Sequence, residues 1–139
     1  MNLLKTKNGK SVGRALTIVC AIFILMNSFY AIGHFFNLFN LEEANKIYAD
    51  SGINLVLTYP MVIYQIVMSA LIVVAAIFTL KGEKLGIFIY LGVQIVGTIY
   101  SIISKTFDVT SLYSVAGMIL LLGWLIYRKK DIFFGEKLS

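Results

Sequence analysis

The side chains able to do acid–base, redox or metal chemistry are scarce in this chain. It has 1 histidine, His34, and 1 cysteine, Cys20. A structural zinc site needs several His and Cys ligands, and a thiol–disulfide centre needs two cysteines. No serine, histidine and acidic residue stand at a spacing that suggests a catalytic triad. The sequence therefore predicts no catalytic residue, no metal site and no cofactor, and it favours a non-enzymatic role.

Uncharged polar side chains inside apolar segments carry the remaining information about function. They gather in the half of each segment that is predicted, from the charge distribution described below, to lie toward the outer surface of a membrane. The opposite halves of the same segments are almost wholly apolar. Polar groups left unpaired in hydrocarbon are costly, so these side chains must meet each other, water or a ligand. We expect an outward-opening cavity, closed below by aliphatic packing and bordered by Asn27, Tyr30, His34, Asn37, Tyr64, Gln65 and Ser101.

Helical spacing supports this grouping. The four candidates of the first segment recur at intervals of three, four and three residues, which places them on one helical face. Gly97 and Ser101 form a small-xxx-small pair in the third segment, which favours close approach of a neighbouring helix.

A second interpretation of the same residues needs no ligand. Tyr59, Tyr100 and Tyr113 could be interfacial anchors, because tyrosine and tryptophan are enriched where lipid meets water. Interhelical hydrogen bonds could account for Asn27, Gln65 and Gln94. The sequence leaves a ligand cavity and a dry, packed bundle both open.

The elements that position these residues follow from composition. The chain has 139 residues, of which 59% are hydrophobic and 14% are charged, and its mean hydropathy is +0.86. A soluble fold this small could not bury so much apolar surface. Segments long enough to span a membrane cover residues 15–39, 59–80, 85–104 and 111–127. We predict one all-α integral membrane domain over residues 1–139, a bundle of four transmembrane helices.

Charge placement predicts the orientation of this bundle. Of the 12 basic residues, all but Lys46 and Lys105 fall in the two terminal segments and in the loop near residues 81–84. The positive-inside rule then predicts a multi-pass protein of the inner, or plasma, membrane with both termini cytoplasmic. An even number of spans requires the same placement. The +5 net charge is thereby explained at the membrane surface, without a nucleic-acid partner.

Residues 40–58 form the longest loop. Its LEEANKIYADSG segment has an acidic first turn, apolar residues at helical spacing and Gly52 as a stop. These features predict a short extracellular amphipathic helix between the first two spans, either a cover for the bundle or a lid over the cavity.

Three stretches resemble small bacterial four-span membrane proteins of unknown function: LKGEKLGIFIY at 80–90, WLIYRKKDIFFGE at 124–136, and GRALTIVCAIF with GHFFN within 13–37. The last stretch is similar to the first span of DoxX-like proteins, in which an arginine opens the span and a polar residue closes it. The acidic residue expected in a DoxX-like second span is absent here. The resemblance implies a four-span membrane fold and assigns no functional residue.

The function that these features favour is binding at the outer face. An immunity or accessory protein would recognise a peptide, a lipid or a membrane-protein partner there. One alternative is a small transporter or channel subunit that acts as a homo-oligomer in the lipid bilayer, and a second is a lipid-modifying membrane enzyme. A polar conduit reaching the cytoplasmic side would favour the transporter, whereas a cavity closed below favours the binding protein.

Overall fold

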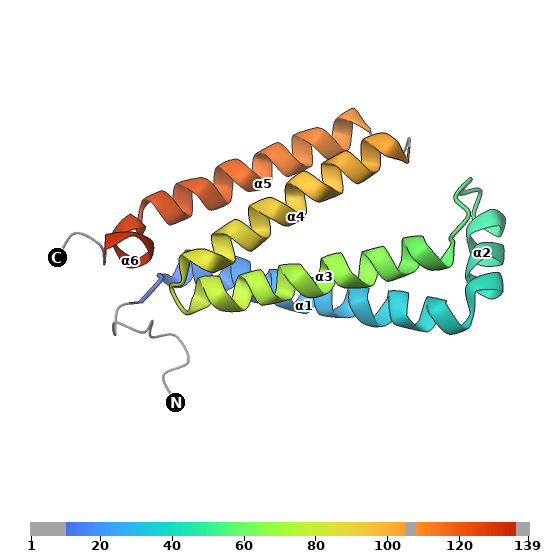
Figure 1. Cartoon of the computed structure of the whole chain (residues 1–139), viewed down its shortest axis with the longest axis horizontal. Helices are drawn as coiled ribbons and strands as arrows, with labels where there is room; N and C mark the ends of the chain where they lie inside the picture. The colour runs from blue at the N-terminus through green and yellow to red at the C-terminus, as the bar shows by residue number, and fades with distance from the viewer. Residues whose placement is uncertain (1–10, 105–107, 136–139) are drawn as a thin grey trace.

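The computed structural model describes residues 11–104 and 108–135. Six helices form in these residues (Figure 1): α1 Arg14–Phe39, α2 Leu41–Asp50, α3 Tyr59–Leu80, α4 Lys84–Ile103, α5 Val109–Tyr127 and α6 Lys130–Phe133. The predicted set of four long helices is confirmed, because α1, α3, α4 and α5 have the length and apolar composition to cross a membrane. Their ends differ from the predicted ends by at most two residues. The short α6 has no counterpart in the sequence predictions.

Several charged residues used to predict the orientation lie outside the described part of the chain. They are Lys5, Lys7, Lys10, Lys105, Glu136 and Lys137.

Local sequence explains where the helices begin and end. Pro60 stands in the first turn of α3, where its missing N–H leaves no helical hydrogen bond broken. Gly52 after α2 and Gly82 after α3 have φ of 75° and 73°, in the left-handed region that glycine adopts without strain. At both sites the amide of the following residue bonds to a carbonyl five residues back, Tyr48 or Phe78. This Schellman arrangement satisfies carbonyls at the helix ends, and it makes Gly52 the stop that the sequence predicts.

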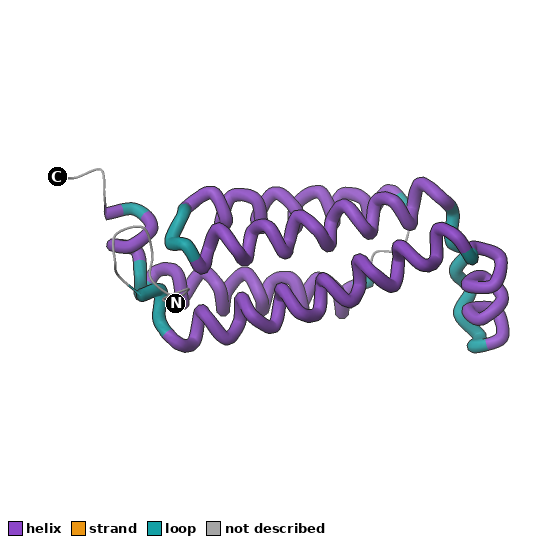
Figure 2. The backbone as a smooth tube through the Cα atoms, turned by 90° about the horizontal axis from the view of Figure 1, so that it is seen from below, coloured by secondary structure: helices purple, strands orange, loops and turns teal. Residues whose placement is uncertain are grey.

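The four long helices lie roughly side by side along one axis (Figures 1 and 2). At the end named here the basic end, α1 and α4 begin and α3 and α5 end, close to Arg14, Lys81, Lys84 and Arg128. The opposite end is named the α2 end. Helix α1 packs along α3, and α3 packs along α4. From the basic end toward the α2 end, α4 and α5 diverge from α1 and α3, as Figure 1 shows.

Apolar packing joins all four long helices near the basic end. Leu16 of α1, Ala75 and Ala76 of α3, Tyr90 of α4 and Leu122 of α5 belong to one buried cluster. Helix α5 meets α1 through this cluster, and its remaining surface is largely exposed. The four long helices are therefore joined near the basic end.

Among the described glycines, Gly86 of α4 lies in the tightest surroundings. A Cβ atom at this position would lie 2.5 Å from the Ala75 carbonyl oxygen and 2.6 Å from the Thr79 amide nitrogen. Since real Cβ atoms do not come so close to backbone atoms, only glycine allows α3 and α4 to touch here. By contrast, a Cβ at Gly97 would meet only the Tyr64 hydroxyl, at 3.8 Å. The sequence predicts a close contact at Gly97, toward the α2 end of α4. The crowded glycine is Gly86, near the basic end.

Helix α2 lies across the end of the bundle (Figure 1) and is fastened there by Asn45. The Asn45 Nδ2 donates to the Leu57 carbonyl oxygen at 3.1 Å, and the Leu57 amide donates to Asn45 Oδ1 at 2.6 Å. Beneath these bonds, Ala44, Leu57 and Val62 form a small buried cluster. The two hydrogen bonds and this cluster fix α2 against the linker that leads into α3.

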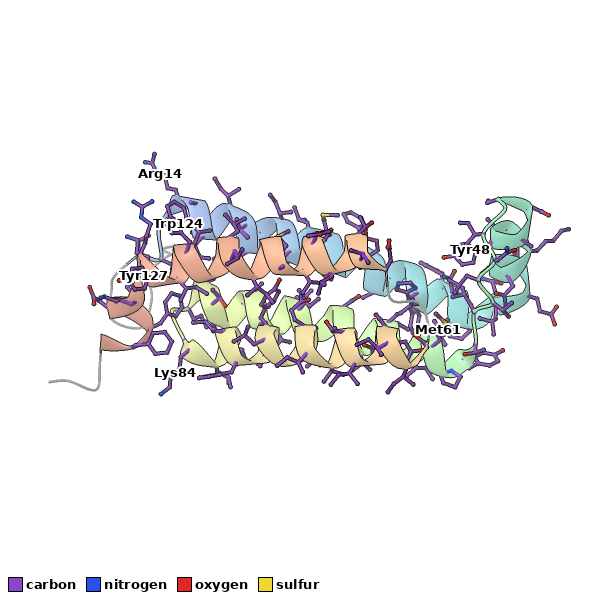
Figure 3. The ribbon with its side chains drawn as sticks, turned by 90° about the horizontal axis from the view of Figure 1, so that it is seen from above. Arg14, Tyr48, Met61, Lys84, Trp124 and Tyr127 are labelled. Carbon is purple, nitrogen blue, oxygen red and sulfur yellow. The ribbon has the colours of Figure 1, made fainter. Side chains whose placement is uncertain are left out.

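Large apolar side chains cover the outside of the long helices. Phe29 of α1, Ile103 of α4 and Leu120 of α5 are 72%, 75% and 73% exposed. A soluble monomer rarely shows so much contiguous apolar surface. Near the basic end, Arg128 lies over the Trp124 ring at 5.1 Å and Lys130 over the Tyr127 ring at 5.1 Å (Figure 3). Aromatic rings beside cations are typical of the border between lipid and water, and this surface is that of a multi-pass membrane protein.

Candidate binding cavity

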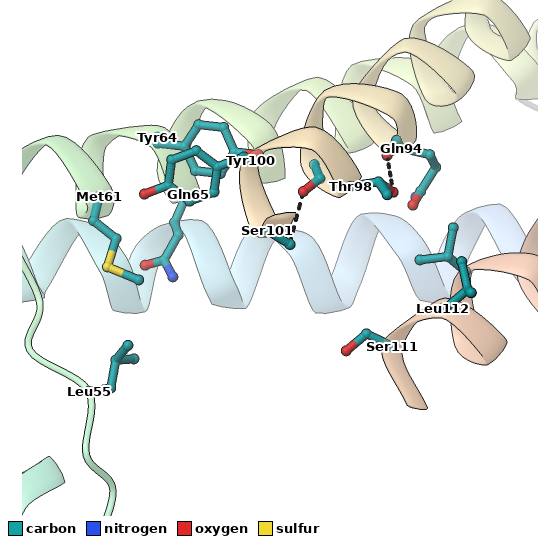
Figure 4. Close-up of a pocket in the computed structure, with 12 residues that line it drawn as sticks. Leu55, Met61, Tyr64, Gln65, Gln94, Thr98, Tyr100, Ser101, Ser111 and Leu112 are labelled. Atoms are coloured by element: carbon teal, nitrogen blue, oxygen red, sulfur yellow. Dashed lines mark hydrogen bonds between the residues drawn. The ribbon is translucent and has the colours of Figure 1, made fainter. Parts of the chain in front are cut away.

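A cavity of about 490 Å³ lies toward the α2 end, between α3, α4 and α5 (Figure 4). It occupies the region where α4 and α5 have diverged from α3. This space is named here the polar cavity, and its lining consists of Leu55, Met61, Tyr64, Gln65, Gln94, Gly97, Thr98, Tyr100, Ser101, Ser111, Leu112 and Val115.

The α4 wall is polar because four small or polar residues recur at helical spacing. Gln94, Gly97, Thr98 and Ser101 stand at positions i, i+3, i+4 and i+7, on one face. The Thr98 hydroxyl donates to the Gln94 carbonyl oxygen at 2.8 Å, and the Ser101 hydroxyl donates to that of Gly97 at 2.9 Å. Both hydroxyl hydrogens are thus used within the helix, and the hydroxyl oxygens remain as acceptors.

Two tyrosines connect α3 and α4 at this wall. The rings of Tyr64 and Tyr100 stack with their centroids 4.0 Å apart and an angle of 20° between their planes. Gly97, one turn from Tyr100, leaves room for the Tyr64 hydroxyl. The stack gives the cavity a rigid aromatic border with two hydroxyl groups, and Figure 4 shows both rings beside Gln65.

Gln65 contributes the most unusual polar atom in the cavity. Its Oε1 is buried and has no hydrogen-bond partner among the described residues. Burying such an oxygen without a donor is costly. Because Gln65 also lines the cavity, a turn of its side-chain amide would present this acceptor to a group that brings an N–H or O–H into the space.

Three of the seven residues proposed from the sequence line this cavity: Tyr64, Gln65 and Ser101. The other four, Asn27, Tyr30, His34 and Asn37, belong to α1, which contributes no residue to the lining. The Asn27 Nδ2 donates to its own helix, to the Phe23 carbonyl oxygen at 2.9 Å. Tyr30 is 54% exposed on the outside of the bundle. The buried His34 Nδ1 has no partner among the described residues, but it lies away from the polar cavity.

The path of α5 explains why the four α1 residues do not line the polar cavity together with Tyr64, Gln65 and Ser101. Leu122 and Leu125 of α5 belong to the buried cluster that includes α1 residues near the basic end, and α5 diverges from α1 toward the α2 end (Figure 1). Spacing along α1 correctly groups residues on one face, but it does not state which helix that face meets.

Lining residues from α5 and the linker were not proposed as site residues. Ser111, Leu112 and Val115 come from α5, and Leu55 comes from the linker. The polar series on α4 was visible as a pattern, and its Gln94 and Thr98 would have completed the α4 wall. The apolar members carry no signal in the sequence, because Leu and Val at such positions equally fit lipid-facing surface.

A second space lies toward the basic end, where the sequence predicted continuous aliphatic packing. This apolar cavity measures about 270 Å³ and is lined by Cys20, Phe23, Ala75, Ala76, Thr79, Ile87, Tyr90, Leu91, Ile119, Leu122, Gly123 and Ile126. The Thr79 hydroxyl donates to the Ala75 carbonyl oxygen at 2.8 Å and is satisfied within α3. Small side chains such as Ala75, Ala76 and Gly123 leave the space unfilled. The lining is apolar as predicted, but the region contains a cavity.

The described residues contain no cluster of three or more His, Cys, Asp or Glu side chains that could hold a metal ion. Comparison with known proteins found no match to this chain among protein-family models, curated protein sequences or solved structures.

Proposed function

We propose that this protein is a non-enzymatic, multi-pass protein of the plasma membrane that binds a ligand in the polar cavity, as an accessory or immunity protein would. The observation that carries the proposal is the Gln65 oxygen, buried without a partner in a cavity of about 490 Å³. Ligand pockets in proteins measure roughly 300–1,000 Å³ and place a few polar groups among apolar walls. The polar cavity has this size and this composition.

The lining chemistry supports binding over catalysis. Its polar groups are two amides and a set of hydroxyls, contributed by Gln65, Gln94, Thr98, Ser101, Ser111 and the two stacked tyrosines. Amides and unactivated hydroxyls position a ligand through hydrogen bonds, but they do not transfer protons readily near neutral pH. A hydrogen-bonding receptor site is the role that such a lining supports best.

Binding is also favoured over transport. Below the polar cavity, the space between the helices is lined by apolar side chains. A polar solute moving toward the basic end would lose its hydrogen bonds in that region. The apolar section therefore supports a site that holds its ligand at one end of the bundle.

Charge supports an outward-facing site. Arg14, Lys81, Lys84, Arg128 and Lys129 lie near the basic end, which the positive-inside rule assigns to the cytoplasm. The residues near the α2 end include the acidic Glu42, Glu43, Asp50 and Asp108. The cavity would then open at the outer face, with α2 as an extracellular helix beside it.

Native mass spectrometry of the purified full chain tests the proposal. Released from its native membrane, the wild-type protein should carry a non-covalent adduct. Ser101→Trp, which fills the cavity, should lose that adduct. Ile99→Trp, on the lipid-facing side of the same helix, should retain it. The proposal is wrong if wild type carries no adduct, or if folded Ser101→Trp, judged by circular dichroism, carries the same adduct as wild type.

A further inference from the structure

The polar and apolar cavities lie end to end along the same helix faces. On α4, the residues that line the apolar cavity are Ile87, Tyr90 and Leu91, and the polar lining begins one turn later at Gln94. From Ile87 to Ser101 this face is about 21 Å long at 1.5 Å per residue. That length is most of the roughly 30 Å hydrocarbon core of a membrane.

Helix α5 repeats the pattern in the opposite chain direction. Its polar-cavity residues, Ser111, Leu112 and Val115, are followed one turn later by Ile119 and then by Leu122, Gly123 and Ile126 of the apolar cavity. Although α4 and α5 are consecutive in the chain, neither packs closely on the other among the described residues. The faces that they turn toward the bundle border the two cavities instead.

Polarity changes along this path. Among the residues that the structure describes, no charged side chain lines either cavity. An ionic group placed there would be desolvated without a counter-charge, which is strongly unfavourable. Hydroxyl groups could donate to Gln65 Oε1 and accept from or donate to the surrounding amides and hydroxyls. The polar cavity thus fits an uncharged, hydroxyl-bearing group.

The apolar cavity fits the other part of such a molecule. Its walls are aliphatic and aromatic, and its 270 Å³ leaves room for one hydrocarbon chain rather than the two chains of a diacyl lipid. We propose that the ligand is a single-chain amphiphile whose uncharged, hydroxyl-bearing head occupies the polar cavity and whose chain runs between α4 and α5 into the apolar cavity. This inference rests on the proposed function and specifies the ligand of the same site.

Two glycines of α5 offer a matched pair of variants. A Cβ at Gly123 or at Gly117 would meet no other atom within 4 Å, so that both positions have room for a side chain to begin. Only Gly123 lines the apolar cavity. Gly123→Leu should therefore block the chain, whereas Gly117→Leu should add an apolar side chain elsewhere on α5. Leu91→Trp would block the same cavity from α4.

The probe is 1-oleoylglycerol carrying a photoactivatable diazirine in its chain, added to the full-length protein in phosphatidylcholine nanodiscs. We expect saturable cross-linking to residues 119–126, which falls at least tenfold in Gly123→Leu and in Leu91→Trp and is unchanged in Gly117→Leu. Excess 1-oleoylglycerol should compete, and lysophosphatidylglycerol, with its charged head, should compete at least tenfold less well. Non-saturable labelling, equal labelling of the two glycine variants, or equal competition by the charged lipid would overturn the inference.

The native adduct separates this inference from the proposed function. If Ser101→Trp removes the adduct and Gly123→Leu keeps it, the polar cavity binds a ligand without a chain, and only the inference fails. If both variants keep the adduct, the proposed function fails as well.

Discussion

At the scale of single residues, the side chain that most needs an explanation is that of Gln65. A buried polar atom left unsatisfied costs about 1–3 kcal/mol, and Gln65 Oε1 has no partner among the described residues. Nearby hydroxyls do not relieve it, because Thr98 and Ser101 donate within their own helix. A protein that retains such a group for stability alone would gain from replacing it with an apolar side chain. Binding of a donor-bearing ligand, as proposed, would give the amide a function.

Gln65→Leu should therefore separate stability from binding. We expect its unfolding midpoint in detergent to equal or exceed that of wild type, because an unsatisfied acceptor is removed at nearly constant volume. The native adduct should fall at least tenfold. The matched control is Asn27→Leu, which changes an amide outside the cavity and should leave the adduct unchanged. A strongly destabilised Gln65→Leu would mean that the amide holds the helices together, against this account.

At the scale of elements, one contact sets how α3 and α4 meet. The backbone of α3 at Ala75 and Thr79 lies so near Gly86 that no residue other than glycine fits at this position. The two helices touch at this point and diverge toward the α2 end (Figure 1). The contact at Gly86 therefore determines how far α3 and α4 have separated at the level of the polar cavity.

Gly86→Ala should push α3 and α4 apart. Overpacking of a tight contact typically costs about 1–3 kcal/mol, so we expect a clear fall in the unfolding midpoint, measured by circular dichroism in detergent. Gly97→Ala changes the same helix at a site where the added Cβ makes only an ordinary contact, and its midpoint should change little. Equal midpoints for the two variants would contradict the assigned crossing point.

Sequence patterns predict where each helix begins and ends far better than they predict which other helices it packs against. Length, hydropathy, Pro60 and Gly52 determine where helices begin and end, and these features are local. The rotation of each helix about its axis depends on tertiary packing, which is why α1 residues such as His34 were grouped with a cavity that α1 does not reach. The sequence also did not indicate that α3 and α4 touch at Gly86, because Gly97 is a glycine of the same helix at an equally suitable spacing.

At the scale of the whole molecule, the bundle is polarised along its axis. Toward the basic end, Leu16, Ala75 and Leu122 belong to one buried apolar cluster, and the space left between the helices has an apolar lining. Toward the α2 end the helices diverge, polar side chains line the space between them, and α2 lies across the end, held by Asn45. Arg14, Trp124, Tyr127 and Lys84 mark one end in Figure 3, and Tyr48 and Met61 mark the other. This polarity suits a receptor that takes its ligand at the outer face.

The most direct test is the reaction of intact cells with an uncharged, hydrophilic thiol reagent that does not cross the membrane, such as a sugar-linked methanethiosulfonate. We expect Ser101→Cys, in a Cys20→Ala background, to be modified from outside. Ile99→Cys, which faces lipid and is 52% exposed on the bundle surface, should not react, and neither should Cys20 of the wild-type chain, in its apolar cavity. Protection of Ser101→Cys in folded protein, with full reaction after denaturation, would contradict the account, as would reaction only in inverted vesicles.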